Sequence, residues 1–305
     1  MTVLANLLTT IASLPWYLLA LTSAVLIAAA TILTKHVLGH EHALEFSSVR
    51  ALFNTALLLP LVPFLPWQTL TWQSVLLLYF IAVMTAAGIL YRTKAQRHLQ
   101  VSFTTPLQNF SPLFLLVISF FFLHETTTPL QLIGVFTMLA GAYLLQTTPH
   151  QSPLKPIQLF LTSKHVHYIV FAMIVLSLAQ AVEKFFFNTF VGTSILLYLF
   201  LLWLFITINF LILEYFRFGI KDILPDIEKD WKWFLTIAAI NIVSVTISLA
   251  AISQPSTKIS LFIPVRRTSA FFVVLIGGKL FKEDNIPRKL LASTLMILGS
   301  VLIIL

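Results

Sequence analysis

The chain has 305 residues, of which 58% are hydrophobic and only 10% are charged. Soluble domains carry about 25% charged residues, so this composition excludes a protein whose surface mainly faces water. The absence of cysteine excludes disulfides, thiolate catalysis and cysteine-ligated metal sites. The net charge is +8, but the basic residues stand at the ends of apolar runs, a pattern typical of membrane topology signals rather than nucleic-acid binding.

Ten apolar runs are long enough to form membrane-spanning helices, since a helix needs about 20 apolar residues to cross the hydrocarbon. We expect them at residues 16–35, 45–66, 74–92, 101–123, 129–146, 167–187, 193–214, 233–252, 259–281 and 287–305. Thr127 or Thr128 is predicted to cap the fifth helix, with Pro129 in its first turn. Residues 217–232 carry both signs of charge and are interpreted as a surface loop with some amphipathic character.

An internal repeat relates the fourth and fifth expected helices to the ninth and tenth. The residues matched 158 positions apart include Pro106 with Pro264, Glu125 with Glu283, Pro129 with Pro287 and Gly141 with Gly299. Five spans in each half would place the second copy upside down. The loop after the fourth span lacks Lys and Arg, whereas its counterpart after the ninth is rich in both, as inversion requires. The sequence therefore predicts an all-α integral membrane protein with two inverted five-helix repeats around a central cavity.

The order of these motifs resembles the EamA-like family of the drug/metabolite transporter superfamily. The pattern is a span with an internal proline, a Glu at its end, then Gln and Gly in the next span: Pro106, Glu125, Gln131, Gly134 and Gly141. In the second copy Lys289 and Ala292 stand in place of the Gln and the first Gly, while Lys35 and Arg50 also fit. The resemblance implies an EamA-like repeat at 1–147, a linker at 148–165 and a second repeat at 166–305. It also implies a cavity lined partly by the fourth and ninth spans, and export or exchange of metabolites.

The orientation of the chain is open. About 15 of the 19 Lys and Arg residues lie at odd-numbered connections between spans, which predicts both termini outside the cytosol. The family resemblance implies both termini inside. In either orientation we expect a multi-pass protein of the cell (inner) membrane.

Arg266 and Arg267 are the strongest candidates for substrate binding. They stand about seven residues into the ninth expected span, roughly 10 Å from its start at 1.5 Å per residue. An arginine at mid-membrane costs about 2.5–3.5 kcal/mol on insertion scales, which favours a water-filled cavity or an anionic ligand. The alternative is that both snorkel to the headgroups or pair structurally with Glu183.

The repeat-equivalent positions in the fourth span hold two amides, Gln108 and Asn109, which either hydrogen-bond the solute or join helices. The remaining substrate-binding candidates are Glu183, Tyr91 and Asn241. The two matched prolines, Pro106 and Pro264, are predicted to kink the fourth and ninth helices. Lys35 and Lys184 are interpreted mainly as interfacial anchors.

No enzyme motif or cofactor site is evident. His36, His40 and His42 form a short cluster in the first loop, interpreted as solvated rather than metal-binding because a strong further ligand set is lacking. We expect no metal, no cofactor and no catalytic residues. The expected partners are a small-molecule substrate and the lipid bilayer, without nucleic acid, in a monomer or homodimer.

The sequence thus predicts a membrane transporter that moves a small metabolite, anionic or zwitterionic, by alternating access and in the direction of export. An amino acid or an organic acid fits the arginines. The first span lacks the carboxylate on which similar small multidrug exporters rely, which disfavours cationic drugs. Two alternatives stay open: a flippase for an anionic lipid-linked carrier, and a membrane-embedded enzyme that uses the His36–His42 loop.

Overall fold

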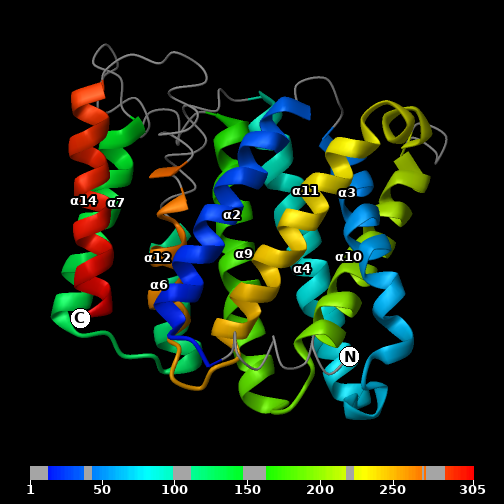
Figure 1. The fold of residues 1–305 in the computed structure, drawn as a ribbon, viewed down its shortest axis with the longest axis horizontal. Helices are drawn as coiled ribbons and strands as arrows, with labels where there is room; N and C mark the ends of the chain where they lie inside the picture. Colours follow the sequence, from blue (N-terminus) through cyan, green and yellow to red (C-terminus); the bar gives the residue numbers. More distant parts are fainter. Residues whose placement is uncertain are drawn as a thin grey trace.

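The computed structural model describes residues 13–37, 43–98, 111–146, 163–217, 223–269, 271–272 and 286–305, and within these ranges it contains helices and no strand. The helices are α2 (Trp16–Val37), α3 (Ala43–Leu58), α4 (Trp72–His98), α6 (Ser111–Leu123), α7 (Pro129–Gln146), α9 (Lys164–Thr189), α10 (Ile195–Arg217), α11 (Ile223–Ile252), α12 (Ile259–Arg266) and α14 (Ile286–Ile304). Two short 3-10 helices, η1 (Leu59–Phe64) and η2 (Trp67–Thr69), connect α3 with α4. All the described helices together form one bundle of upright helices (Figure 1). The all-α prediction is therefore confirmed for the described residues.

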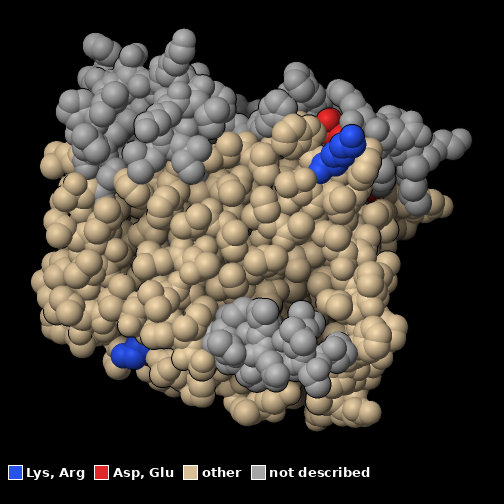
Figure 2. All heavy atoms as spheres, in the orientation of Figure 1, with Lys and Arg blue, Asp and Glu red and all other residues tan. Residues whose placement is uncertain are grey.

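Six of the described helices are long and apolar enough to cross a membrane, judged by length and composition. Three further apolar helices are shorter, at Ser111–Leu123, Pro129–Gly141 and Thr294–Ile304. Charged side chains on the face shown in Figure 2 lie toward its upper and lower edges, and the broad band between them is almost free of charge. This supports a membrane-embedded bundle, while the count of ten spans stays a prediction.

The second expected span changes its helix type but stays one candidate span, Ala43–Phe64, because α3 ends at Leu58 and the chain continues directly as η1, which contains Pro60 and Pro63. One boundary differs from expectation. The interpretation of residues 217–232 as a loop was wrong for most of that stretch. Helix α11 already begins at Ile223 and bends at Asp230, where the backbone is non-helical (φ −121°, ψ 17°). Apolar runs mark where the membrane ends, whereas a helix can continue beyond it into water.

The start of α7 follows the predicted cap. The Thr128 amide donates to Gln131 Oε1 at 3.0 Å, and the Gln131 amide donates to Thr128 Oγ1 at 3.2 Å. This reciprocal pair is a capping box, with Pro129 at the first helical position, where the missing amide costs nothing. The prediction is confirmed with Thr128 as the cap residue, and α7 has the expected bounds.

Two pairs of helices that the sequence pattern relates, α6 with α12 and α2 with α9, run antiparallel. Helix α6 ends where α12 begins, since Glu125 contacts the amide of Ile259. The segment before α2 and the end of α9 lie at the same place, because Leu14 and Lys184 both bond to Gln254. These contacts support an inverted arrangement, which stays a prediction together with the repeat boundaries; most of the predicted linker lies outside the described residues.

Helices α7 and α14 cross at unusually close range through small residues. A Cβ added to Gly299 would lie 2.6 Å from the Met138 amide nitrogen and 2.7 Å from the Gly134 carbonyl oxygen. One at Gly141 would lie 2.7 Å from the Ala292 carbonyl oxygen. Without a hydrophobic force between helices in lipid, such close backbone packing is a main source of association. The glycines of the repeat motif are therefore required by the crossing.

Replacing Gly299 by Leu should separate α7 from α14, because its Cβ alone would already overlap two backbone atoms. We expect a loss of about 3 kcal/mol in the free energy of unfolding, at the upper end for overpacking, measured by denaturant titration of the purified protein in mild detergent. Ala140→Leu is the matched control, since Ala140 is exposed on α7. Equal stability of the two variants would contradict the crossing.

Candidate functional site

The two arginines predicted from the ninth span stand where its helix is interrupted. Helix α12 ends at Arg266, and the next residues form tighter 3-10-type turns in which the Thr268 amide donates to the Val265 carbonyl at 3.1 Å. The regular helix is thus interrupted at residues 267–268, shortly after Pro264, and residues 269, 271 and 272 are helical again, so the kink at Pro264 stays a prediction. Pro106, its expected counterpart, lies outside the described residues.

Both guanidinium groups bind hydroxyl groups of neighbouring helices. Arg266 Nη1 donates to Ser248 Oγ on α11 at 3.2 Å, and its Cζ lies 5.9 Å from the centre of the Phe262 ring. Arg267 Nη2 donates to Ser111 Oγ on α6 at 2.7 Å. These contacts point the two side chains toward different helices of the bundle, as expected for adjacent residues on a helix. Both are only partly buried.

A small network of serine hydroxyl groups orients Ser248, the hydrogen-bond partner of Arg266. Ser248 Oγ lies 2.8 Å from Ser23 Oγ on α2 and donates to the Ser244 carbonyl at 2.9 Å. All three serines are at most 2% exposed. A buried hydroxyl that is already oriented in this way presents its oxygen to the guanidinium. Helices α2 and α11, one from each half, thus share the support of this arginine.

Glu183 supplies a carboxylate that interacts electrostatically with Arg266. Its Oε1 accepts a hydrogen bond of 2.9 Å from the Tyr198 hydroxyl on α10, and it attracts Arg266 electrostatically. Tyr198 is fully buried. The bond fixes the carboxylate on the α9–α10 side of the site. The sequence suggested Glu183 as a candidate but not Tyr198, which lies within an apolar run without any distinguishing neighbour.

Two further arginines extend the positive charge toward the other side of the bundle. Arg50 on α3 and Arg92 on α4 repel each other electrostatically. Arg92 also interacts with both Arg266 and Arg267. Arg92 Nε is buried without a hydrogen-bond partner among the described residues. We refer to Arg50, Arg92, Arg266 and Arg267 as the guanidinium cluster.

The cluster has an excess of cationic donors. Each guanidinium carries five N–H donors and no acceptor. Arg266 and Arg267 each donate one hydrogen bond to a serine. Among the interactions described for the cluster, Glu183 supplies a carboxylate, and the fully buried Glu214 accepts a 3.2 Å hydrogen bond from Ser48. The site can therefore hold an anion through charge and directed hydrogen bonds.

Two other predicted residues, Tyr91 and Asn241, show described contacts with neighbouring helices and none with a guanidinium group of the cluster. Tyr91 packs its ring against Phe171 on α9, at 4.9 Å between centroids, and Asn241 donates to Asn54 Oδ1 on α3 at 3.0 Å. Both contacts join helices, so a role in binding stays a prediction. Gln108 and Asn109 lie outside the described residues, as do His40 and His42.

The position of Lys184 corrects its interpretation as an interfacial anchor. It is 3% exposed, and its Nζ donates to the carbonyls of Ile252 at 2.8 Å and Gln254 at 2.7 Å. The ammonium thus caps the C-terminal end of α11, where free carbonyls attract cations. A lysine near a span end has the same sequence pattern in both roles. Among the described residues no group of three potential metal ligands occurs.

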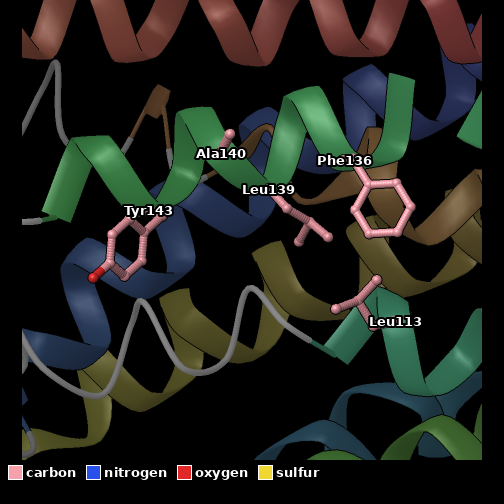
Figure 3. A pocket seen from close by; sticks show the side chains of 5 residues that line it. All are labelled: Leu113, Phe136, Leu139, Ala140 and Tyr143. Carbon is pink, nitrogen blue, oxygen red and sulfur yellow. The ribbon is translucent and has the colours of Figure 1, made fainter. Parts of the chain in front are cut away.

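An apolar cavity of about 370 Å³ lies beside α6 and α7. Its lining consists of Leu113, Phe136, Leu139, Ala140 and Tyr143 (Figure 3). None of the four arginines contributes to it. Its surface suits acyl chains or apolar side chains rather than an anion.

Comparison with known proteins agrees with this fold. The model of the EamA-like transporter family matches residues 14–147. A solved crystal structure, described only as that of a protein, superposes with a TM-score of 0.69 over 94% of this chain and 95% of that one, at 11% sequence identity. None of the curated proteins matches the sequence significantly. The predicted resemblance is therefore confirmed for residues 14–147, which match the model of the EamA-like transporter family, a family of membrane transporters in the drug/metabolite transporter superfamily.

Proposed function

We propose that the protein carries a small metabolite with an acidic group, an amino acid or an organic acid, across the cell membrane by alternating access. The observation that carries this proposal is the inward-directed pair Arg266 and Arg267, each bonded to a serine of another helix. Export is the direction that the family resemblance implies. The protein would act as a carrier and not as an enzyme.

The free-energy cost of placing arginines at membrane depth favours an anionic solute. A cation at membrane depth is costly unless it is solvated or paired. The described neighbours supply hydroxyl groups and one interacting carboxylate, Glu183, which do not balance the charge of the cluster. A carboxylate of the solute supplies the missing charge and accepts two N–H bonds from one guanidinium in fork geometry. A cationic solute would add to the repulsion.

Alternating access fits the position of the cluster between the two halves. Arg50 and Arg92 belong to the first half of the chain, and Arg266 and Arg267 to the second. Rocking of one half against the other would expose the solute to each side in turn, as in transporters built from inverted repeats. A flippase would instead need its cations at a lateral gap, and the apolar cavity beside α6 and α7 contains none of them.

The direct test is substitution of Arg266 by Gln in purified protein reconstituted into liposomes. We expect exchange of radiolabelled succinate and glutamate to be measurable for the parent protein and strongly reduced for Arg266→Gln. Loss of a hydrogen bond to a charged group costs about 1.5–3 kcal/mol, which corresponds to about 10- to 150-fold weaker binding.

Arg217→Gln is the matched control, because Arg217 is exposed at the end of α10, and its exchange rate should equal that of the parent. Full activity of Arg266→Gln would remove the anion argument. Transport of a quaternary amine in place of the acids would do the same. Movement of a fluorescent anionic phospholipid without any transport of soluble acids would identify a flippase.

A further inference from the structure

We infer that the solute carries at least two negative charges, and that the two halves of the chain each hold one end of it. This inference rests on the proposed function and narrows its substrate class. A dicarboxylate and a phosphate monoester share the required chemistry. The anchors are Arg50 and Arg92 in the first half and Arg266 and Arg267 in the second.

The two pairs of arginines approach the middle of the bundle from opposite sides. Arg50 is seven residues past the start of α3, about 10 Å along the helix at 1.5 Å per residue, and Arg92 stands three residues before the end of the apolar span Trp72–Ala95. These helix ends lie on the same side, since Ser47 Oγ contacts Thr93 Oγ1 at 3.5 Å. Arg266 is seven residues past the start of α12, again about 10 Å deep.

Helix α12 starts on the other side of the bundle. The end of α4 packs against the beginning of α9 through Tyr91 and Tyr168, whose ring centroids lie 5.4 Å apart. The opposite end of α9 lies at the end of α11, where Lys184 binds the Ile252 carbonyl, and α12 follows shortly after. The arginine pairs therefore approach the middle of the bundle from opposite sides, and an electrostatic interaction between Arg92 and Arg267 agrees with this placement.

A single negative charge does not satisfy this arrangement. Four guanidinium groups interact with one another, whereas Glu183 is linked electrostatically to Arg266 alone among them. A monoanion held by Arg266 and Arg267 leaves Arg50 and Arg92 in mutual repulsion, with Arg92 Nε buried and without a partner among the described residues. A solute with a second anionic group, or a phosphate with two charges, reaches both pairs. It would also draw the halves together, because it interacts with both at once.

The test compares anions of similar size and increasing charge. Isothermal titration of the purified full-length protein in neutral detergent would use butyrate, succinate and glycerol 3-phosphate. We expect succinate or glycerol 3-phosphate to bind at least about tenfold more tightly than butyrate, which is the effect of about 1.4 kcal/mol. Arg92→Gln should remove that advantage, while Arg217→Gln should leave all three affinities unchanged.

The outcomes separate this inference from the proposed function. Equal affinity for butyrate and the dianions in the parent protein would overturn the inference, while acid transport that depends on Arg266 would stand. An absence of binding by all three anions would overturn both. Because the charge series is measured on the parent protein, the inference is decided even if Arg92→Gln does not fold. Tighter binding of glycerol 3-phosphate than of succinate would indicate that both negative charges of the solute belong to one phosphate group.

A second inference comes from a different place, the side of the bundle where α12 begins. The Glu125 carboxylate, in the loop after α6, accepts hydrogen bonds from the Ile259 amide at 2.9 Å, the Ser260 amide at 3.0 Å and Ser260 Oγ at 2.5 Å. Lys258 Nζ donates to the Thr126 carbonyl at 2.5 Å, and Gln254 Nε2 donates to the Leu14 carbonyl at 3.0 Å. Each of these bonds joins the first half to the second. We refer to the Glu125 contacts as the latch.

We infer that the latch closes this side of the transporter and opens when the halves rock. A carboxylate at the start of a helix satisfies free amides and favours the positive end of the helix dipole. The latch therefore stabilises the state in which the two halves touch here. The substitution Glu125→Gln removes one acceptor and turns an amide donor toward other donors, so this variant should open this side more often. Thr126→Ala is the matched control, since only the backbone of Thr126 takes part.

The chain has no cysteine, so one introduced cysteine reports opening without background. Thr257→Cys places it beside the latch at a position that is 1% exposed. We expect a membrane-impermeant thiol reagent, applied to both sides of detergent-free nanodiscs, to modify it at least about tenfold faster in the Glu125→Gln background than in the parent or in Thr126→Ala, since loss of a charged hydrogen bond has an effect of this order. Equal rates in all three backgrounds would overturn the latch, as would equal acceleration by Thr126→Ala. Gel filtration would show that the variants remain folded.

Discussion

The solvation of charge within an apolar bundle constrains most of this structure. A guanidinium group keeps its charge in any protein, so the chain must supply it with hydroxyl groups, carboxylates, water or a ligand. Here serine hydroxyls from α11 and α6 each bind one arginine, and Glu183 interacts with one of them. The guanidinium N–H donors that these groups leave over are available to a ligand. The proposed substrate class follows from them.

The helices around the cluster are joined by polar contacts rather than by apolar packing alone. On the α3 side, Thr55 Oγ1 lies 2.8 Å from Thr207 Oγ1 of α10, and Asn241 of α11 bonds to Asn54. Such bonds hold helices in lipid, where hydrophobic association is weak, and each contributes about 0.6 kcal/mol on average. The pair α7 and α14 uses the other solution, direct backbone contact through glycine. The polar contacts join the halves near the cluster, while the glycine crossing builds a separate pair at the edge of the bundle (Figure 1).

The elements of the fold were largely predictable, because lipid demands long apolar helices and the sequence must supply them. The cap at Thr128 and the bounds of α7 followed from local chemistry. The rotation of each helix did not follow, since these spans are apolar on every face and carry no stripe that marks the inner side. That is why Tyr198, Ser248 and Ser111 were missed, and why Lys184 was assigned to the headgroups although it caps α11.

The arginines were found from sequence because their cost in the membrane is large, whereas their partners are ordinary residues whose role depends on the neighbouring helix. The central claim is that the space around them is wet and receives an anion. The most direct measurement is modification of Ser111→Cys, beside Arg267, by a small charged thiol reagent in nanodiscs, with and without succinate. The account predicts modification that succinate slows. A cysteine that never reacts, while the protein stays folded, or one that reacts at the same rate with succinate present would contradict it.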